Sequence, residues 1–429
     1  MRPPPGFSMV MAEGAVGTLC SAIYGILCAK LWGPELSGIT TLAFALASFF
    51  SFISCLSIDQ IVIARYVSDK EHQNLFLTTL YIRSAATLLS FIGLMGSSLA
   101  MNDFLGAWIW LPAFAFIQNA LLTMDLLRLR TQALNELHRQ SPWRIKVIFI
   151  IFFSKLAVIT SLPAVDSVWI TQLLAIFEAI LLLAISCIFT HHHHPVATTR
   201  SIKWSVISGY AKKITNQSWH LFLANLLVIL FLKMDYLFLA QLSTARDLGL
   251  YASAMRVLEI YVALGNLALL QLYPQLTADK ANSASQYQSS LRYAFGFAYM
   301  IAGLIIFFNV IVGQWIIRNV LGPEYDTVAR YSSLFCILAI PLLSGTVRGF
   351  AISLQGIHYN HFIAAAIGIF VSLPILYILI PKLGFKGALL ADIAGYYSSA
   401  MLSSILLPSL RSIAQAQWHP RFHLLLRNK

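Results

Sequence analysis

Long apolar stretches constrain the fold of this chain more than any other feature. A helix needs about 20 apolar residues to cross the roughly 30 Å hydrocarbon layer of a membrane, and such stretches recur along the whole sequence. Of the 429 residues, 58% are apolar and 11% are charged, whereas a soluble domain has about 45–50% apolar and about 25% charged residues. We therefore expect an all-α integral membrane protein, and this composition excludes a soluble enzyme.

The apolar stretches predict about twelve transmembrane helices. Breaks between them are expected at turn-forming pairs, namely Gly33-Pro34, Ser141-Pro142, Gly322-Pro323 and the step from Pro381 to Gly384. None of the connecting loops is long enough to hold a soluble catalytic domain. The predicted spans cover 8–31, 37–64, 75–100, 105–129, 144–163, 167–190, 217–241, 248–275, 289–317, 327–353, 361–381 and 385–408.

The distribution of basic residues predicts the orientation in the membrane. Among 29 Lys and Arg residues, about 19 fall on the side of the N-terminus, about 6 on the opposite side and about 4 inside spans. Positive residues concentrate on the cytoplasmic side, so we expect both termini in the cytoplasm. The same bias accounts for most of the net charge of +12 without any nucleic-acid partner.

A polar segment divides the predicted spans into two groups of six. We expect a six-helix bundle over 1–190, a basic and His-rich cytoplasmic linker over 191–215, and a second six-helix bundle over 216–429. The run His191–His194 in the linker is interpreted as solvated low-complexity sequence, because adjacent histidines do not converge on one metal ion. No metal or cofactor site is predicted.

Weak internal similarity supports two repeats. Glu35-Leu36 shortly precedes Gly38 at the start of the second span, and Asp247-Leu248 precedes Gly249 at the start of the eighth. Because each repeat holds an even number of spans, both have the same orientation. The repeats are then related by a pseudo-two-fold axis along the membrane normal, as in transporters that bind substrate between two bundles.

Ionisable side chains inside the spans are the candidate functional residues. A charge near the bilayer centre costs at least about 2.5–3.5 kcal/mol, so it needs a partner, a watery cavity or access to the interface. One group lies within a turn or two of a cytoplasmic end, where we expect the side chains to extend to the interface. That group consists of Glu13, Asp59, Asp125, Arg128, Arg292 and Arg348.

A second group lies too deep for that explanation. One interpretation is internal pairing, for example of Arg256 with Glu259 at i and i+3. The other is a water-filled cavity with a net positive lining, which attracts an anionic head group, while its acids carry protons or sodium ions. The second group consists of Arg83, Lys155, Glu178, Arg256 and Glu259, with Asp392 at intermediate depth.

The sequence has no Gly-rich phosphate loop, zinc-protease motif, nucleophile elbow or acidic glycosyltransferase signature on a plausible loop. His358 and His361 are on the predicted cytoplasmic side without a carboxylate to complete a catalytic set. We therefore predict that the protein is not an enzyme.

Several short motifs, in this order and placement, resemble polysaccharide-export flippases. These are the Wzx-type O-antigen and teichoic-acid translocases of the multidrug/oligosaccharidyl-lipid/polysaccharide exporter superfamily. The motifs are Leu31-Trp32-Gly33-Pro34-Glu35-Leu36-Ser37-Gly38, Lys233-Met234-Asp235-Tyr236, Asp247-Leu248-Gly249-Leu250-Tyr251-Ala252-Ser253-Ala254 and Leu321-Gly322-Pro323-Glu324-Tyr325.

The resemblance implies movement of an undecaprenyl-diphosphate-linked oligosaccharide across the bacterial plasma membrane by alternating access, driven by an H+ or Na+ gradient. Membrane lipid and other polysaccharide-assembly membrane proteins are the implied partners. By position, Asp235 matches the acid at the end of the seventh span, Arg256 a cavity-lining stretch, and Lys30 the basic residue before the first turn. The histidine run in the linker is not required by the family.

From these observations we expect the diphosphate to be held by Arg83, Lys155 and Arg256. The ion-coupling acids are expected among Glu178, Glu259, Asp392 and Asp235.

Three alternatives remain open at this level. A drug or metabolite cation antiporter of the same superfamily favours a net acidic cavity. A membrane glycan polymerase or glycosyltransferase usually needs a large external loop with catalytic groups. A scaffold subunit without transport activity leaves no specific pattern in the sequence.

Overall fold

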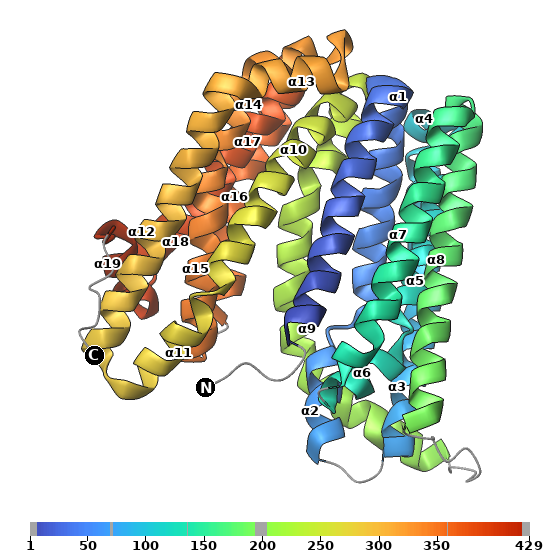
Figure 1. Cartoon of the computed structure of the whole chain (residues 1–429), viewed down its shortest axis with the longest axis vertical. Coiled ribbons are helices and arrows are strands. Elements are labelled where there is room, and N and C mark those ends of the chain that lie inside the picture. The colour runs from blue at the N-terminus through green and yellow to red at the C-terminus, as the bar shows by residue number, and fades with distance from the viewer. Residues whose placement is uncertain (1–6, 69–71, 135, 194–203, 358, 423–429) are drawn as a thin grey trace. The chain divides into compact units, whose positions relative to one another are not determined.

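The computed structural model of the protein describes residues 7–68, 72–134, 136–193, 204–357 and 359–422. Helices make up almost all of this part of the chain, which contains no β-strand, as Figure 1 shows. This confirms the all-α prediction. The histidine run lies outside the side chains that are described.

The chain divides into two compact units. The N-terminal unit comprises Met1–Tyr24 and Ile39–Ile229, and the C-terminal unit comprises Gly25–Gly38 and Leu230–Lys429. These limits differ from the expected bundles 1–190 and 216–429, because residues 25–38 pack with the second half of the chain. The last helix of the first half, moreover, begins at Trp204, inside the expected linker.

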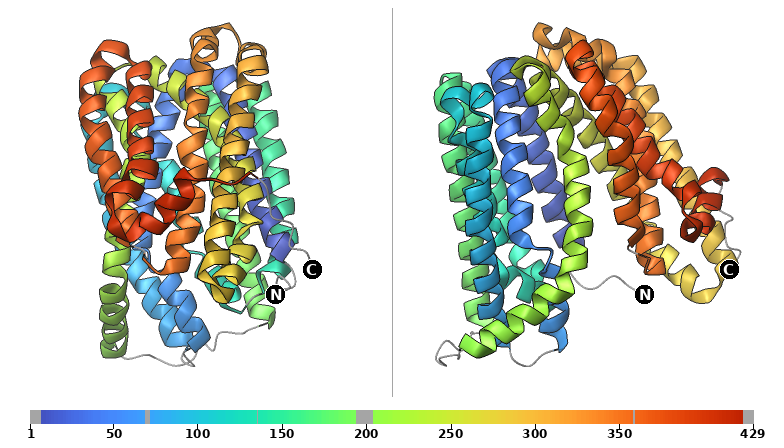
Figure 2. Two further views of the ribbon diagram at one scale, coloured as in Figure 1. Left: turned by 90° about the vertical axis from the view of Figure 1, so that its left-hand side faces the viewer. Right: turned by 180° about the vertical axis from the view of Figure 1, so that it is seen from behind.

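The described residues of the first half of the chain form nine α-helices. They are α1 (Phe7–Cys55), α2 (Asp59–Ser68), α3 (His72–Ala100), α4 (Asn102–Leu105), α5 (Leu111–Thr123), α6 (Leu126–Ala133), α7 (Leu137–Ser161), α8 (Ala164–His193) and α9 (Trp204–Leu242). Within the N-terminal unit, α8 packs against both α5 and α7 (Figures 1 and 2).

The described residues of the second half form ten more. They are α10 (Ala245–Leu270), α11 (Tyr273–Asn282), α12 (Ala284–Phe308), α13 (Gln314–Leu321), α14 (Asp326–Ile337), α15 (Ala339–Gln355), α16 (Tyr359–Leu383), α17 (Phe385–Tyr397), α18 (Ser403–Leu406) and α19 (Arg411–Trp418). π-Helical turns at Asn309–Gly313 and Ser398–Leu402 connect α12 to α13 and α17 to α18.

Within the described residues, nine helical segments are long and apolar enough to cross a membrane. The count is ten if Asn102–Trp108 and Leu111–Ala133, bent by 77°, form one span. Two differences explain most of the gap from twelve. The first two predicted spans form one segment kinked at Gly33, and α7 carries several cations. The twelve crossings and the cytoplasmic termini stay predictions.

Glycine and proline account for most of the breaks. Gly33 (φ 75°), Gly322 (φ 99°) and Gly384 (φ 58°) adopt backbone angles that favour glycine. The break predicted at Ser141-Pro142 is wrong, because Pro142 lies inside the continuous helix α7. A single proline removes one backbone hydrogen bond, and neighbouring groups in a packed membrane helix can compensate for that loss.

At one end of the N-terminal unit, short helices pack on long ones. This end is predicted to face the cytoplasm. The apolar cluster at this end joins α2, α3, α6 and α9. Its fully buried members include Val62 on α2, Leu75 on α3, Leu126 on α6 and Ile214 on α9. These contacts hold α6, which carries Arg128, against the longer helices.

Gly38 and Gly249, which occupy matching positions in the two predicted repeats, lie against each other in the C-terminal unit. A Cβ atom on Gly38 would lie 3.0 Å from the backbone nitrogen of Gly249 and still closer to the carbonyl of Ala245. A Cβ on Gly249 would likewise collide with the carbonyl of Pro34. Small residues allow helix backbones to approach this closely in membranes, so these positions require glycine.

Gly249→Val should therefore destabilise the protein, because the added side chain meets backbone that cannot move aside. Overpacking of this kind costs about 1–3 kcal/mol. We expect a lower Tm in detergent and a smaller monodisperse fraction by size-exclusion chromatography.

Gly303→Ala is the matched control, since a Cβ there meets nothing within 4 Å. Helix propensity predicts an equal or higher Tm for this variant. A Tm for Gly249→Val equal to that of the native protein would contradict the close approach.

Candidate functional site

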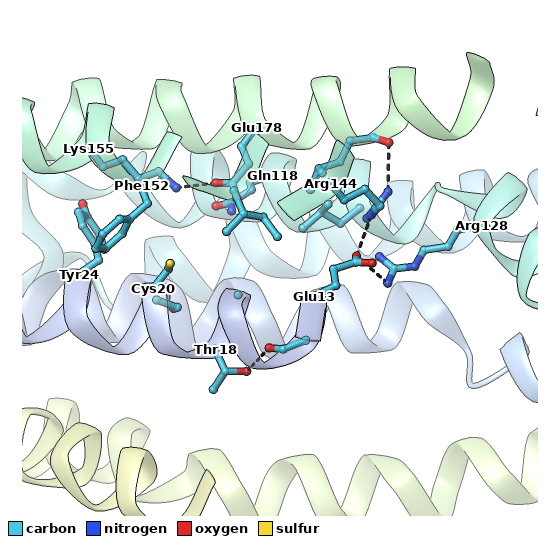
Figure 3. Close-up of a pocket in the computed structure, with 16 residues that line it drawn as sticks. Glu13, Thr18, Cys20, Tyr24, Gln118, Arg128, Arg144, Phe152, Lys155 and Glu178 are labelled. Atoms are coloured by element: carbon cyan, nitrogen blue, oxygen red, sulfur yellow. Dashed lines mark hydrogen bonds and ion pairs between the residues drawn. The ribbon is translucent and has the colours of Figure 1, made fainter. Parts of the chain in front are cut away.

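A cavity of about 450 Å³, lined by several charged side chains, lies inside the N-terminal unit. Its walls come from α1, α5, α6, α7 and α8, and Figure 3 shows the residues that line it. Ligand pockets typically measure about 300–1,000 Å³, so the cavity is large enough for a small polar group. Three cations and two carboxylates line it, namely Arg128, Arg144, Lys155, Glu13 and Glu178.

Helix α1 leaves room for the cavity because one of its faces carries small side chains. Gly14, Gly17, Thr18 and Ser21 follow one another at helical spacing and all line the wall. Thr18 donates its hydroxyl hydrogen bond to the carbonyl of Gly14 at 2.9 Å. These small side chains leave space between this part of α1 and helices α7 and α8.

One end of the cavity is built on Glu13. Its carboxylate accepts hydrogen bonds from Arg144 Nε at 2.9 Å and from the Ser141 hydroxyl at 2.7 Å. Arg128 forms a third contact at 3.0 Å. Glu13 and Arg144 are buried, whereas the Arg128 side chain is 35% exposed. Arg128 is thus the cation of this cluster that a ligand reaches most easily.

Arg144 connects several helices through its guanidinium. Besides Glu13 on α1, it contacts Asp125 at 3.3 Å and the Leu182 carbonyl on α8 at 3.2 Å. Asp125 caps the N-terminus of α6 by accepting a hydrogen bond from Arg128 N at 3.2 Å. The Ser186 hydroxyl on α8 also donates to Asp125, at 2.8 Å. Arg144 is therefore structural, and it fixes the cavity walls.

A second charged centre lies about 16 Å further along α7, since eleven residues separate Arg144 from Lys155 at 1.5 Å each. Lys155 Nζ donates to Glu178 on α8 at 2.7 Å. Their side chains are 14% and 18% exposed, and the Tyr24 ring lies 5.9 Å from Lys155 Nζ. Figure 3 shows this pair and the Glu13 cluster at separate places in the cavity.

The other predicted cations lie elsewhere. Arg83 on α3 is buried, forms an ion pair with Asp59 and donates to the Thr123 carbonyl; it is not among the residues that line the cavity. In the C-terminal unit, Arg256 donates to the Gly25 carbonyl at 2.8 Å.

Two predicted coupling acids come together in the C-terminal unit. Asp235 on α9 and Asp392 on α17 both contact the hydroxyl of Tyr251 on α10, and all three side chains are buried. A phenol carries one proton, so it donates to one carboxylate only. The other carboxyl group therefore needs a further positive charge in order to stay this close. Glu259, by contrast, is exposed on α10.

The expectation that Glu13, Asp125 and Arg348 extend to the interface is wrong. All three are at most 6% exposed, because each finds hydrogen-bond partners inside the protein. Arg348, for example, donates to the Ser403 hydroxyl at 2.6 Å. The sequence pattern did not single out Arg144 as a functional residue. The small residues that follow Glu13 were the one available signal that its face borders a cavity.

Within the described residues, no group of three or more His, Cys, Asp or Glu side chains is arranged to hold a metal ion.

Comparison with known proteins identifies related sequences and folds. The family model described as polysaccharide biosynthesis protein matches residues 27–330. No curated protein sequence matches the chain.

Similar solved structures include the lipid II flippase MurJ in an inward closed conformation, at a TM-score of 0.64 and 13% identity over 94% of this chain and 89% of that one. An inward-facing multidrug resistance transporter of the MATE family in the MOP superfamily gives 0.59 and 13% over 94% of both chains. A MOP superfamily transporter from Pyrococcus furiosus, described as having a binding pocket of reversed polarity, gives 0.59 and 14% over 96% of both chains. At these identities, the likeness establishes the fold.

Arg144→Met should strongly destabilise the N-terminal unit, because it leaves Glu13 and Asp125 without their shared cation. Breaking a buried ion pair by removing one partner costs about 3–5 kcal/mol. We expect a clear fall in Tm in detergent.

Arg139→Met is the matched control, since Arg139 pairs with Glu136 on the surface at 3.4 Å and its side chain is 47% exposed. Exposed pairs contribute at most about 1 kcal/mol. Similar Tm values for the two variants would contradict a structural role for Arg144.

Proposed function

Because the chain belongs to the polysaccharide biosynthesis protein family, we propose that it is a flippase for an undecaprenyl-diphosphate-linked oligosaccharide. It moves the glycan by alternating access from the inner to the outer leaflet of the bacterial plasma membrane, and no covalent bond changes. The multi-pass helical fold and its likeness to MurJ and MATE transporters support this proposal.

The observation that carries the proposal is the charged cavity in the N-terminal unit. Arg128 and Lys155 lie at its two ends, and both cations are partly exposed. An Arg guanidinium donates two hydrogen bonds to phosphate oxygens, and a Lys ammonium binds phosphate as a point charge. This combination suits an anionic diphosphate.

The size of the cavity indicates how the substrate is divided. The cavity measures about 450 Å³, within the range of about 300–1,000 Å³ that ligand pockets have. That volume accommodates the diphosphate and an adjoining sugar ring. The polyprenyl chain stays in the lipid, and the remaining sugars extend beyond the cavity.

In this proposal, Arg128 attracts the diphosphate first and Lys155 binds it deeper in the cavity. Arg83 acts indirectly, because it is occupied by Asp59 and the Thr123 carbonyl. Arg256 is retained as a predicted substrate contact in the C-terminal unit.

We place ion coupling at Asp235 and Asp392. Two buried carboxyl groups that share one hydroxyl need an added positive charge, which either H+ or Na+ supplies. Loading and release of that charge change the packing of α9, α10 and α17, which meet at Tyr251. Glu259 stays a further predicted coupling acid.

The partners expected are membrane lipid and other polysaccharide-assembly membrane proteins.

A drug or metabolite cation antiporter is the alternative that the MATE likeness favours. Its substrate requires acids without cation partners. In the N-terminal cavity, both lining carboxylates are bound to cations, which favours the anionic substrate.

Conditional depletion tests the function, with complementation by the native protein or by Lys155→Met. Depletion should make lipid-linked glycan accumulate in the cytoplasmic leaflet. Losing one charged hydrogen bond of about 1.5–3 kcal/mol should lower translocation by Lys155→Met about 10- to 100-fold. Translocation is measured by the labelling of outward-facing glycan.

Lys146→Met serves as the control, because Lys146 lies on α7 beside Trp143 and outside the cavity. Unchanged outward labelling after depletion would exclude the flippase. Full activity of Lys155→Met at normal protein levels would remove Lys155 from the mechanism.

Asp235→Asn should uncouple transport from the ion gradient, because the amide keeps the shape but cannot bind H+ or Na+ in the same way. In proteoliposomes we expect an imposed gradient to accelerate translocation by the native protein and to have no effect on the variant. Asp326→Asn, which changes a partly exposed acid paired with Arg318 and Arg330, should behave like the native protein. A gradient response that persists in both Asp235→Asn and Asp392→Asn would place coupling elsewhere.

A further inference from the structure

The two carboxylates of the N-terminal cavity are held very differently. Glu13 accepts from Arg144 and Ser141 and also pairs with Arg128. Within the described part of the chain, the Glu178 carboxylate has one hydrogen-bond partner, Lys155 Nζ at 2.7 Å. A carboxylate offers about four acceptor positions. Glu13 is therefore a fixed part of the wall, whereas Glu178 is attached at a single point.

Two hydrogen-bond donors without a partner among the described residues line the same cavity as the Lys155–Glu178 pair. Gln118 on α5 lies next to it in Figure 3, and its amide has no hydrogen-bond partner among the described residues. The Ser21 hydroxyl on the opposite wall is likewise unpaired within that part of the chain. An ammonium, an amide and a hydroxyl that face one space together suit a group rich in anionic oxygen atoms.

We propose that Glu178 occupies the place on Lys155 that the substrate's diphosphate takes during transport. Substrate binding is then an exchange, in which a phosphate oxygen replaces the carboxylate on the Lys155 ammonium. When the substrate leaves, Glu178 returns to Lys155. Glu178 is thus a release group that lowers the affinity of the site, and this inference rests on the proposed flippase function.

The exchange has a defined response to protons. Protonation of Glu178 removes the competitor of the substrate and strengthens substrate binding at Lys155. When an inward-moving proton drives outward movement of the glycan, the two are exchanged as in an antiporter. Proton and substrate must then weaken each other's binding, and this linkage is reciprocal. The Lys155–Glu178 pair has the opposite sign, so Glu178 is not the coupling acid, and coupling is left to the Asp235–Tyr251–Asp392 cluster.

Other groups that face Glu178 do not change this sign. Cys20 and Tyr24 on α1 and Gln118 on α5 line the cavity around it. The remaining charges belong to the separate cluster of Glu13, Arg128 and Arg144, which also includes Asp125. Glu178 is the carboxylate in direct contact with Lys155.

Binding of inorganic pyrophosphate to the full-length protein in detergent micelles tests this exchange by calorimetry. Glu178→Gln keeps the side-chain shape and removes the competing charge. It should bind pyrophosphate about tenfold more tightly than the native protein, at the low end of the effect of one charged hydrogen bond. Lys155→Met should weaken pyrophosphate binding. Adding Lys155→Met to Glu178→Gln should abolish the tenfold gain in affinity.

Glu136→Gln is the matched control, since Glu136 pairs with Arg139 on the surface at 3.4 Å, away from the cavity. Its affinity should equal that of the native protein.

Equal or weaker pyrophosphate binding by Glu178→Gln would overturn the exchange. Native-like binding by Lys155→Met would overturn it as well, by placing the anion elsewhere. Both results leave the flippase function intact, because depletion and outward labelling test that function separately. In the labelling assay, Glu178→Gln should translocate glycan more slowly than the native protein, because release is slowed.

Discussion

The high cost of an unpaired charge inside a membrane protein determines how the N-terminal unit is built. Arg144 is buried on α7, so it must find its partners within the protein. It finds Glu13 on α1, Asp125 at the start of α6 and a carbonyl on α8. These bonds hold four elements around one space. The small residues of α1 keep that space open, and the cavity follows from both features together.

The two units contain different chemistry. In the N-terminal unit, the carboxylates that line the cavity are neutralised by cations, and two of those cations are partly exposed. In the C-terminal unit, Asp235 and Asp392 share a neutral phenol. The first arrangement suits recognition of an anion, and the second suits binding of a proton or metal cation. Separating these tasks lets a transporter change its affinity for one ligand through the occupancy of the other.

Sequence reasoning was most successful where local chemistry decides the structure. The apolar stretches located the helices, and Gly33 and Gly322 marked real breaks because their backbone angles favour glycine. It was less successful for Pro142, which a packed helix accommodates. Lys155 and Glu178, which were singled out by depth, line the cavity, but Glu13 was assigned to the interface. Depth along one helix does not reveal which charges a neighbouring helix brings into contact.

The sequence by itself determined that this chain is a helical membrane protein and where most of its apolar helices lie. These properties depend on residues close together along the chain. Only the tertiary structure decided that Arg83 belongs to Asp59, that Lys155 belongs to Glu178 and that Tyr251 joins Asp235 to Asp392. The reason is physical, since an ion pair depends on which helix faces meet. That choice is made by side-chain packing between segments up to about 140 residues apart.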